Sequence, residues 1–359
     1  MRTIAIINQK GGCGKTTSTI NIGACLAHKK TKVLIVDMDP QAHATLGLGY
    51  KPGEYSGSIH DLLVNKDQSH ETIEDVLLRI SPYLHLIPSD IVLSTAEPIL
   101  LQRDNREYYL ADILKSISDQ YDIAIIDCPP NIGILTFNSL LASNEVIIPI
   151  ESGLFSLHGL ARLMETINLV NLNCGHKIKV NALATMYDRR TKIAEETLFE
   201  TKRCFLGHVF KTVINQNVKL KEAASYGKPI ISYCQKCSGF KDYMDLSKEI
   251  LELEEVKFPM EDDRRKEIKP PVITREGVLF TCYAPQAKSV RLVANFNEWN
   301  QEQMPLFNIE GDGIWQKIVP LKEGKYQYKF VIDGEWMKDP INPNIVSSPF
   351  GENSIFEVQ

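Results

Sequence analysis

The nine residues 9–17, Gln-Lys-Gly-Gly-Cys-Gly-Lys-Thr-Thr, constrain the fold more than any other part of the chain. They follow the apolar run 3–8 directly, which places a glycine-rich turn between a buried strand and the start of a helix. Consecutive backbone N–H groups in such a turn can point at one anion, which the positive end of the helix dipole also attracts. The segment therefore predicts a phosphate site for a nucleoside triphosphate. Its expected binding residues are Gly11, Gly12, Cys13, Gly14, Lys15, Thr16 and Thr17.

The loop departs from the usual pattern in one respect. Gln9 replaces the glycine that normally stands five positions before Gly14, and an extra lysine, Lys10, follows it. This form resembles the loop of the ParA/MinD family of ATPases, and the resemblance extends over about residues 1–250. The other matching segments are 33–41 with Asp-Met-Asp-Pro-Gln, the Walker B-like run 121–130, and the stretches 145–159, 185–188 and 217–229, which are similar to the chromosome-partitioning, Soj-type branch.

The resemblance implies roles for individual residues. Lys15 and the loop amides would hold the phosphates of ATP, Thr16 would ligate Mg²⁺, and Asp127 would support the metal through water. Asp39 is the candidate to orient the attacking water, with Asp37 supporting the metal shell.

The family pattern also implies a dimer and a base-binding loop. Lys10 would complete the partner's site across a nucleotide-sandwich homodimer, and hydrolysis would be slow until a partner protein stimulates it. The loop that flanks the adenine in the family corresponds to residues 215–217, so Asn215 and Asn217 are candidates for base contacts. Cys13 occupies the variable position of the phosphate loop, and we assign it no chemistry.

Short apolar runs alternate with segments whose apolar residues recur at helical spacing. Because the runs lack clean alternation, they predict an α/β P-loop NTPase, a mostly parallel sheet with helices on both faces and the site at the carboxyl ends of the strands. We expect strands at 3–8, 32–38, 121–127, 145–150, 178–186 and 209–214. We expect helices at 15–29, 109–119, 133–143, 157–172, 194–205 and 242–253.

Length and cysteine usage fit an intracellular enzyme with two cores. The chain has 359 residues, too many for one typical domain, and its apolar runs are of strand length, too short to span a membrane. The first strand begins almost at Met1 without a signal peptide, and the eight cysteines are scattered, so we expect reduced thiols and a cytoplasmic location. Cys234 and Cys237 form a single CxxC, whose metal or redox role would need partners that the spacing does not supply.

A basic segment interrupts a chain whose formal charge is −5. Residues 189–228 hold nine lysines and arginines against four acids. In the partitioning ATPases this region forms a sequence-independent DNA surface, which needs charge and reach rather than base recognition. The alternative is a solvated helical face, because glutamates stand among the lysines, and one family arginine is missing where Asn215-Gln216-Asn217 stands. The DNA-contact candidates are Arg189, Arg190, Lys192, Lys219 and Lys221.

The last quarter of the chain has a different composition. We place the ATPase domain at 1–255, a charged, proline-bounded linker at 256–271, and a second domain at 272–359. Alternating runs separated by turn residues predict an antiparallel, Ig-like β-sandwich. Its strands are expected at 277–283, 289–294, 314–319, 325–332 and 354–358.

Segments 294–299 and 323–340 resemble the glycogen-binding module of AMP-activated kinase β-subunits. By motif position, the residues that line the α-glucan groove in that family are Trp299, Lys329, Trp336 and Asn353. Indole can stack on the apolar C–H face of a sugar, whose hydroxyl rim needs donors and acceptors such as Lys and Asn. Core packing is the alternative for both tryptophans, and we expect Trp315, within an alternating strand, to be core.

Together these features lead to one hypothesis and two alternatives. The hypothesis is an ATP-driven dimer that uses non-specific DNA as a matrix to position or segregate a cargo, glycogen or a glucan-bearing complex, and is therefore nucleoid-associated. The first alternative is a glucan-sensing regulatory ATPase without transport. The second is a plasmid or chromosome partitioning ATPase whose β-domain is a protein-docking module.

Overall fold

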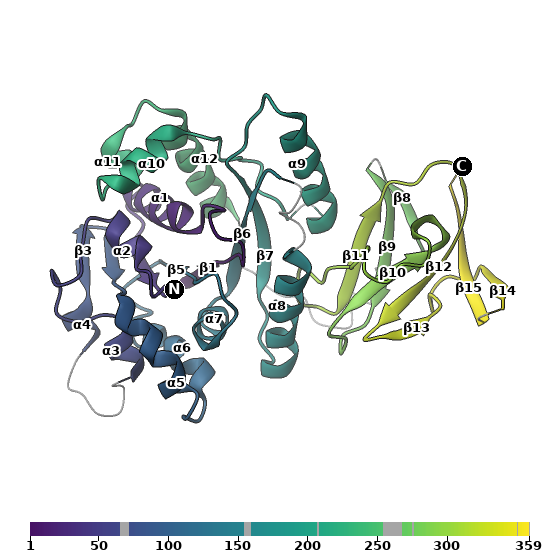
Figure 1. Cartoon of the computed structure of the whole chain (residues 1–359), viewed down its shortest axis with the longest axis horizontal. Helices are drawn as coiled ribbons and strands as arrows, with labels where there is room; N and C mark the ends of the chain where they lie inside the picture. The colour runs from purple at the N-terminus through teal and green to yellow at the C-terminus, as the bar shows by residue number, and fades with distance from the viewer. Residues whose placement is uncertain are drawn as a thin grey trace. The chain divides into compact units, whose positions relative to one another are not determined.

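The computed structural model describes residues 1–64, 72–153, 159–206, 208–253, 268–274, 276–349 and 351–358. Most of the predicted linker, residues 256–267, lies outside these ranges. The chain divides into two compact units (Figure 1). Unit 1 comprises Met1–Leu160, Val180–Thr197 and Phe210–Glu255; unit 2 comprises Ala161–Lys179, Leu198–Val209 and Val256–Gln359. Within the described ranges, every helix is too short or too polar to cross a bilayer.

The described part of the chain contains a seven-stranded, mostly parallel sheet whose central strands are apolar and fully buried. The strand order is β3-β4-β2-β5-β1-β6-β7, and β3 runs antiparallel to β4. Because β5 lies between β1 and β2, the register places Asp127 beside both Ile6 and Asp37 at the carboxyl edge. The strands are β1 (Arg2–Ile6), β2 (Val33–Asp37), β3 (Leu78–Ser81), β4 (Leu84–Ile87), β5 (Ile123–Asp127), β6 (Glu145–Glu151) and β7 (Lys179–Thr185).

Helices cover both faces of this sheet (Figure 1). One face carries α1 (Lys15–His28), α10 (Val218–Ser225), α11 (Ile230–Tyr233) and α12 (Ser238–Glu252); the other carries α3 (Ile59–Val64), α5 (Ala96–Leu100), α6 (Tyr109–Ser116) and α7 (Ile134–Leu141). The remaining helices are α2 (His43–Gly47), α4 (Ile73–Val76), α8 (Leu160–Cys174) and α9 (Lys192–Phe205). The apolar side chains of α1 and α12 form one continuous core with those of the strands.

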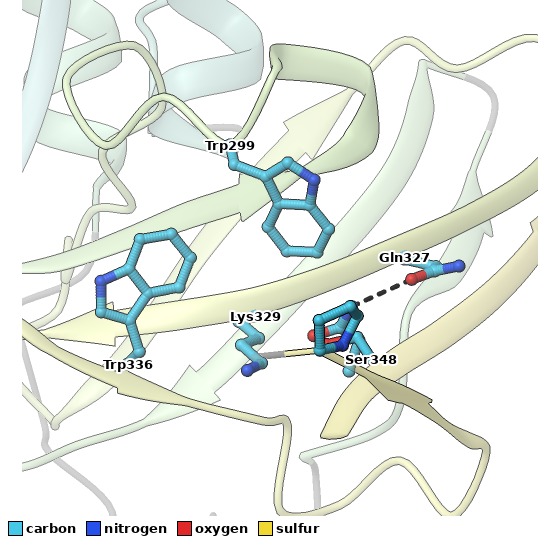
Figure 2. Close-up of a pocket in the computed structure, with 7 residues that line it drawn as sticks. Trp299, Gln327, Lys329, Trp336 and Ser348 are labelled. Atoms are coloured by element: carbon cyan, nitrogen blue, oxygen red, sulfur yellow. Dashed lines mark hydrogen bonds between the residues drawn. The ribbon is translucent and has the colours of Figure 1, made fainter. Parts of the chain in front are cut away.

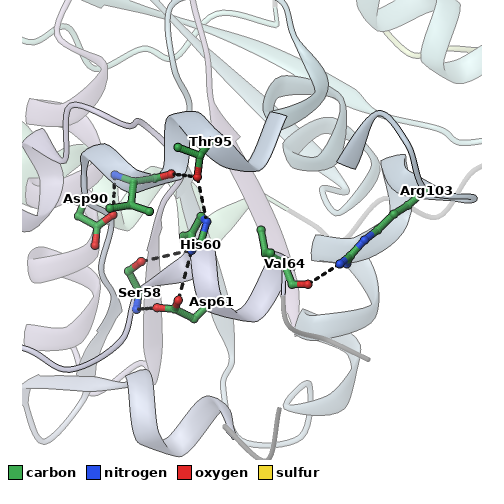
Figure 3. Close-up of polar contacts among 8 residues, drawn as sticks. Ser58, His60, Asp61, Val64, Asp90, Thr95 and Arg103 are labelled. Atoms are coloured by element: carbon green, nitrogen blue, oxygen red, sulfur yellow. Dashed lines mark hydrogen bonds and ion pairs between the residues drawn. The ribbon is translucent and has the colours of Figure 1, made fainter. Parts of the chain in front are cut away.

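Polar contacts fix the short helices on the second face (Figure 3). His60 of α3 contacts Asp61 through Nδ1 and the Thr95 hydroxyl through Nε2, both at 3.2 Å. The Thr95 hydroxyl donates to the Val92 carbonyl oxygen, so this Thr–His–Asp arrangement serves as a tie between helices and not as an activated nucleophile. The Arg103 guanidinium donates to the Val64 carbonyl oxygen at 2.6 Å and closes the end of α3.

The predicted fold class is confirmed, with differences at the edges of the sheet. Residues 209–214, expected as a strand, follow β7 irregularly: only the Phe210 and Ile214 amides donate to it, to the Ala182 and Ala184 carbonyl oxygens. The short strands β3 and β4 were not predicted. The helix expected at 242–253 begins earlier, at Ser238.

The β-domain of unit 2 contains antiparallel sheets, as predicted for a sandwich. One described sheet has the order β10-β12-β15-β14 with β13 on β12, and the other has the order β11-β9-β8. Trp315 lies in the core, as expected, and its indole N–H donates to the Ala284 carbonyl oxygen. The strands are β8 (Val272–Thr274), β9 (Gly277–Tyr283), β10 (Val290–Ala294), β11 (Ile314–Val319), β12 (Gly324–Ile332), β13 (Glu335–Met337), β14 (Ile345–Ser348) and β15 (Gly351–Val358); β8, β13 and β14 were not among the predicted strands.

Candidate nucleotide and carbohydrate sites

The glycine-rich loop has the backbone of an anion cradle. Gly12 and Gly14 adopt φ values of 76° and 89°, a left-handed conformation that other residues rarely tolerate. Gly14 is the N-cap of the 14-residue helix α1, and no side chain caps the helix, so its first amides remain available to an anion. The Thr185 hydroxyl donates to the Cys13 carbonyl oxygen at 2.8 Å and fixes the loop from β7.

Two lysines flank the cradle in different environments. Lys15 is buried, and its ammonium donates to the Lys10 carbonyl oxygen at 3.2 Å. Lys10 extends from the loop, and its ammonium lies 2.8 Å from Glu151 Oε2 at the end of β6. Lys10, which the family resemblance assigns to the partner's nucleotide, is thus paired with Glu151 of its own chain.

The metal candidates converge at the ends of β5 and α1. The Thr16 hydroxyl donates to Asp127 Oδ2 at 2.7 Å, and Thr19 donates to Asp127 Oδ1 at 3.0 Å. Burial, followed by the charge of Asp37, raises the pKa of Asp127. These hard oxygens at the mouth of the phosphate loop suit Mg²⁺, which would neutralise phosphate charge there. Thr16 would hold the metal, and Asp127 would orient Thr16 and the metal's waters.

The two aspartates after β2 have different surroundings. Asp39 lines the pocket in front of the loop and accepts from the Gln41 amide at 2.9 Å. Asp37 is fully buried, and its oxygens accept from Asp39 N, Thr45 N and the Thr45 hydroxyl. Burial raises the pKa of Asp37. Of the two, Asp39 would therefore be the residue to orient a water, and Asp37 would act on the metal shell only through the residues that it holds.

The pocket before the loop has a volume of about 720 Å³. Its walls include the glycine loop, Asp39, residues of α2 and three residues of α10: Lys221, Ala224 and Ser225. Asn215 and Asn217, the candidates for base contacts, do not line it. Asn215 donates to Asp242, and Asn217 caps α10 and donates to the Ser238 hydroxyl at 2.7 Å, so base contacts would have to replace these bonds.

The four carbohydrate candidates lie in a single groove of about 630 Å³ (Figure 2). Trp336 is 46% exposed and Trp299 is half-buried, which excludes core packing for this pair. Their ring centroids are 6.3 Å apart at 33°, and both rings point towards the space beside Lys329. The groove is lined by Trp299, Gln327, Lys329, Trp336, Ser348, Pro349 and Asn353.

The strands explain why these side chains meet. Gln327 and Lys329 alternate along β12 and so share one face, and Trp336 on β13 is opposite Val331 of the same face. Asn353 on β15 donates to the Gln327 amide oxygen at 2.9 Å. Trp299 comes shortly after a helical turn, and its own φ is 59°. This left-handed backbone conformation is energetically costly for tryptophan. Sequence reasoning missed Gln327, Ser348 and Pro349, although the i, i+2 spacing of Gln327 and Lys329 could have indicated the first.

The basic candidates for DNA contact are exposed but largely paired within the chain. Arg190 pairs with Asp188, whose pKa it lowers to about 2, and Lys192 lies 3.7 Å from Glu196. Lys219 pairs with Glu222 at 2.7 Å, and Arg189 donates to Asn215. Lys221 differs because it lines the nucleotide pocket.

A glycine loop of this geometry at the carboxyl edge of a mostly parallel sheet defines the class of the first unit, a P-loop nucleoside triphosphatase. Residues 1–180 match the family described as "AAA domain". The chain is 40% identical over 259 residues to the chromosome partitioning protein ParA of Myxococcus xanthus, and 41% identical over 250 residues to the sporulation initiation inhibitor protein Soj of Bacillus subtilis. These alignments cover 72% and 69% of this chain, and 90% and 98% of the relatives. The chain belongs to the ParA/Soj family of partitioning ATPases.

Two further comparisons extend this assignment. Cobyrinic acid a,c-diamide synthase from Mycobacterium smegmatis, solved with an ATP analog and magnesium, is 31% identical with a TM-score of 0.61, covering 70% of this chain and 94% of that chain. The phosphate loop, Thr16 and Asp127 of this chain would hold the same two groups, ATP and Mg²⁺. Residues 268–351 match "Carbohydrate-binding module 48 (Isoamylase N-terminal domain)". The protein is thus a ParA/Soj-type ATPase with a C-terminal carbohydrate-binding module.

Proposed function

We propose that this protein is an ATP-switched positioning factor that couples α-glucan, or a complex bearing it, to a DNA matrix. The observation that carries the proposal is the tryptophan groove in a chain whose other unit is a ParA/Soj-type ATPase. Two indoles offer apolar faces to sugar rings, and Lys329, Gln327 and Asn353 offer donors and acceptors to hydroxyls.

Glucan binding is tested on the full chain with glycogen and linear α-glucans. Trp299→Ala and Trp336→Ala should each weaken affinity by about 1.5–3 kcal/mol, because each loses apolar contact with a sugar face. Met337→Ala is the matched control, since Met337 adjoins Trp336 and is similarly exposed but does not line the groove. Thermal unfolding checks that the variants are folded. Absence of binding by the folded wild type would favour a protein-docking module.

We further propose that ATP assembles a homodimer, which then binds DNA without sequence preference through the 189–228 segment. Exposed ion pairs such as Lys192–Glu196 are weak, so DNA phosphates can replace the glutamates. Binding should weaken steeply with salt, with a log–log slope of about −0.9 per neutralised phosphate. Hydrolysis stimulated by a partner protein would then release the dimer.

Charge reversal tests the DNA role. Arg189→Glu, Lys192→Glu and Lys219→Glu together should abolish DNA binding by the ATP-bound dimer while ATP binding persists. Reversal of the exposed Lys29, Lys51 and Lys115 changes net charge equally outside the segment and should have a much smaller effect. If the two triple variants bind DNA equally, net charge alone governs binding and the surface assignment is wrong.

The glucan-sensing alternative makes a separate prediction. If glucan regulates the ATPase without transport, saturating glycogen should change the ATP hydrolysis rate of the wild type, and Trp336→Ala should remove the change. A positioning factor needs no such coupling.

A further inference from the structure

The single CxxC of the chain lies at the junction of α11 and α12. Cys234 is the C-cap of α11 and Cys237 the N-cap of α12, and Gln235 and Lys236 form the turn between them. The Cys237 thiol donates to the Cys234 carbonyl oxygen at 3.1 Å. The first and last Cα atoms of a β-turn lie within about 7 Å of each other, and a disulfide needs Cα atoms about 4.4–6.8 Å apart. The turn therefore brings Cys234 and Cys237 close enough for a disulfide, which the CxxC spacing alone did not establish.

The surroundings favour two-thiol chemistry over metal binding. Among the described residues, no three His, Cys, Asp or Glu side chains are grouped so as to hold a metal ion. Both thiols are reduced and half-buried. Of the remaining cysteines, Cys174 is exposed and the others are buried, so the CxxC is the one close pair within reach of a small reagent in the described chain.

Residues on both sides of the turn are bonded to the wall of the nucleotide pocket. Tyr233, just before it, donates to Glu222 of α10 at 2.8 Å. Ser238, just after it, accepts from Asn217, the residue that caps α10. Because α10 contributes Lys221, Ala224 and Ser225 to the pocket, a covalent change in the turn is transmitted to that wall by two short connections.

We propose that Cys234 and Cys237 form a reversible dithiol–disulfide site whose oxidation alters nucleotide binding through α10. The oxidant is a low-molecular-weight disulfide. One cysteine thiolate attacks it, forming a mixed disulfide and expelling one small thiolate; the second cysteine then attacks the mixed disulfide, closes the Sγ–Sγ bond and expels the other. Two protein thiols are oxidised, the reagent is reduced to two thiols, and the two protons pass to the leaving thiolates. The proposal depends on ATP binding but not on the glucan or DNA roles.

The test uses the full chain with oxidised glutathione as the probe. Peptide mass spectrometry without reductant should find Cys234 joined to Cys237 with the loss of two hydrogens. Burial raises the pKa of the Cys237 thiol, which slows exchange, so the reaction is followed to completion. The ATP dissociation constant of the oxidised protein should differ at least about fivefold from that of the reduced protein, and dithiothreitol should reverse the change.

Matched variants separate this site from general oxidation. The double variant Cys234→Ser/Cys237→Ser can form neither the mixed disulfide nor the linkage, so it should keep the affinity of the reduced protein after treatment, with circular dichroism confirming the fold. Cys174→Ser removes the exposed cysteine and should respond like the wild type. Three results would overturn the proposal: no Cys234–Cys237 linkage, equal ATP affinity in both redox states, or loss of the response in Cys174→Ser.

Discussion

The ion pair between Lys10 and Glu151 is the residue-scale feature with the clearest consequence for switching. Lys10 cannot reach a partner's nucleotide while its ammonium lies 2.8 Å from Glu151. Glu151→Gln should therefore lower the ATP concentration needed for dimerisation. A partly exposed pair contributes about 0.2–1 kcal/mol, so the midpoint should fall by no more than about fivefold.

Size-exclusion chromatography over an ATP titration measures this shift. Lys10→Ala should not dimerise at any ATP concentration. A midpoint for Glu151→Gln equal to or above that of the wild type would show that the pair does not restrain Lys10.

Asp127 links function to stability at the same scale. Because the pKa of Asp127 is raised in the folded protein, ionisation of its carboxyl group destabilises the folded state. This destabilisation is absent below the unfolded-state pKa near 3.8, grows as the pH rises towards the folded-state pKa, and persists above it. Asp127→Asn should therefore stabilise the nucleotide-free protein at pH 8 by on the order of 1–3 kcal/mol and have little effect at pH 4. Mg²⁺-dependent ATP binding should weaken at the same time.

Urea denaturation at the two pH values measures the effect. Asp119→Asn, on the exposed surface, changes charge equally and should leave the pH dependence unchanged. A less stable Asp127→Asn protein at pH 8 would show that the bonds from Thr16 and Thr19 outweigh the burial of charge.

Functional residues could be predicted from the sequence where they lie together in one segment or match the motif of a known family. The phosphate loop is one continuous segment, so its residues were predictable together. Glu151 was not, because its partner Lys10 is 141 positions away and a single glutamate after a strand has no pattern of its own. Ser348 and Pro349 were missed because they lie at the end of β14 and directly after it, and β14 itself was not predicted.

At the scale of elements, the contact between α2 and α10 closes one side of the nucleotide pocket. Gly227 adopts φ 62°, and a Cβ there would lie 2.6 Å from Gly49 Cα. Gly227→Ala should separate the ends of the two helices, costing about 1–3 kcal/mol in stability and weakening ATP affinity.

Gly53→Ala is the matched control. Gly53 also has positive φ, at 89°, but a Cβ would meet nothing within 4 Å, so only the backbone strain of about 1 kcal/mol remains. Equal destabilisation by both substitutions, with unchanged ATP affinity, would mean that the close approach of Gly49 and Gly227 is not needed for the pocket.

Long periodic elements were predictable and short or irregular ones were not. The apolar runs predicted β2, β6, β7 and the strands β9 to β12 to within one residue at each end, and β1 and β5 to within two, because burial on both faces or strict alternation leaves a clear pattern. β3 and β4 have four residues each, too few for a period. Residues 209–214 have a strand-like pattern, but they bond β7 through separate amides only.

At the scale of the whole molecule, the candidate nucleotide site and the candidate carbohydrate site lie in different units. Lys15→Ala should abolish ATP binding, because the phosphates lose their main counter-ion, and leave glycogen binding unchanged. Trp336→Ala should weaken glycogen binding by the amount given above and leave ATP binding unchanged. Paired measurements of ATP and glycogen affinity on the two full-length variants test this separation, and loss of both activities in either folded variant would contradict it.

The strand order also determines when this enzyme can first fold. β5 lies between β1 and β2, although more than eighty residues separate it from β2 in the sequence. During synthesis, β1 and β2 therefore leave the ribosome before β5, the strand that pairs with both of them, has been made. The edge of each strand that faces β5 stays unpaired and apolar until then. The gap closes only after residue 127 has left the exit tunnel. Until then the nascent chain carries an intact phosphate loop without a sheet to support it, and is exposed to the aggregation that chaperones prevent.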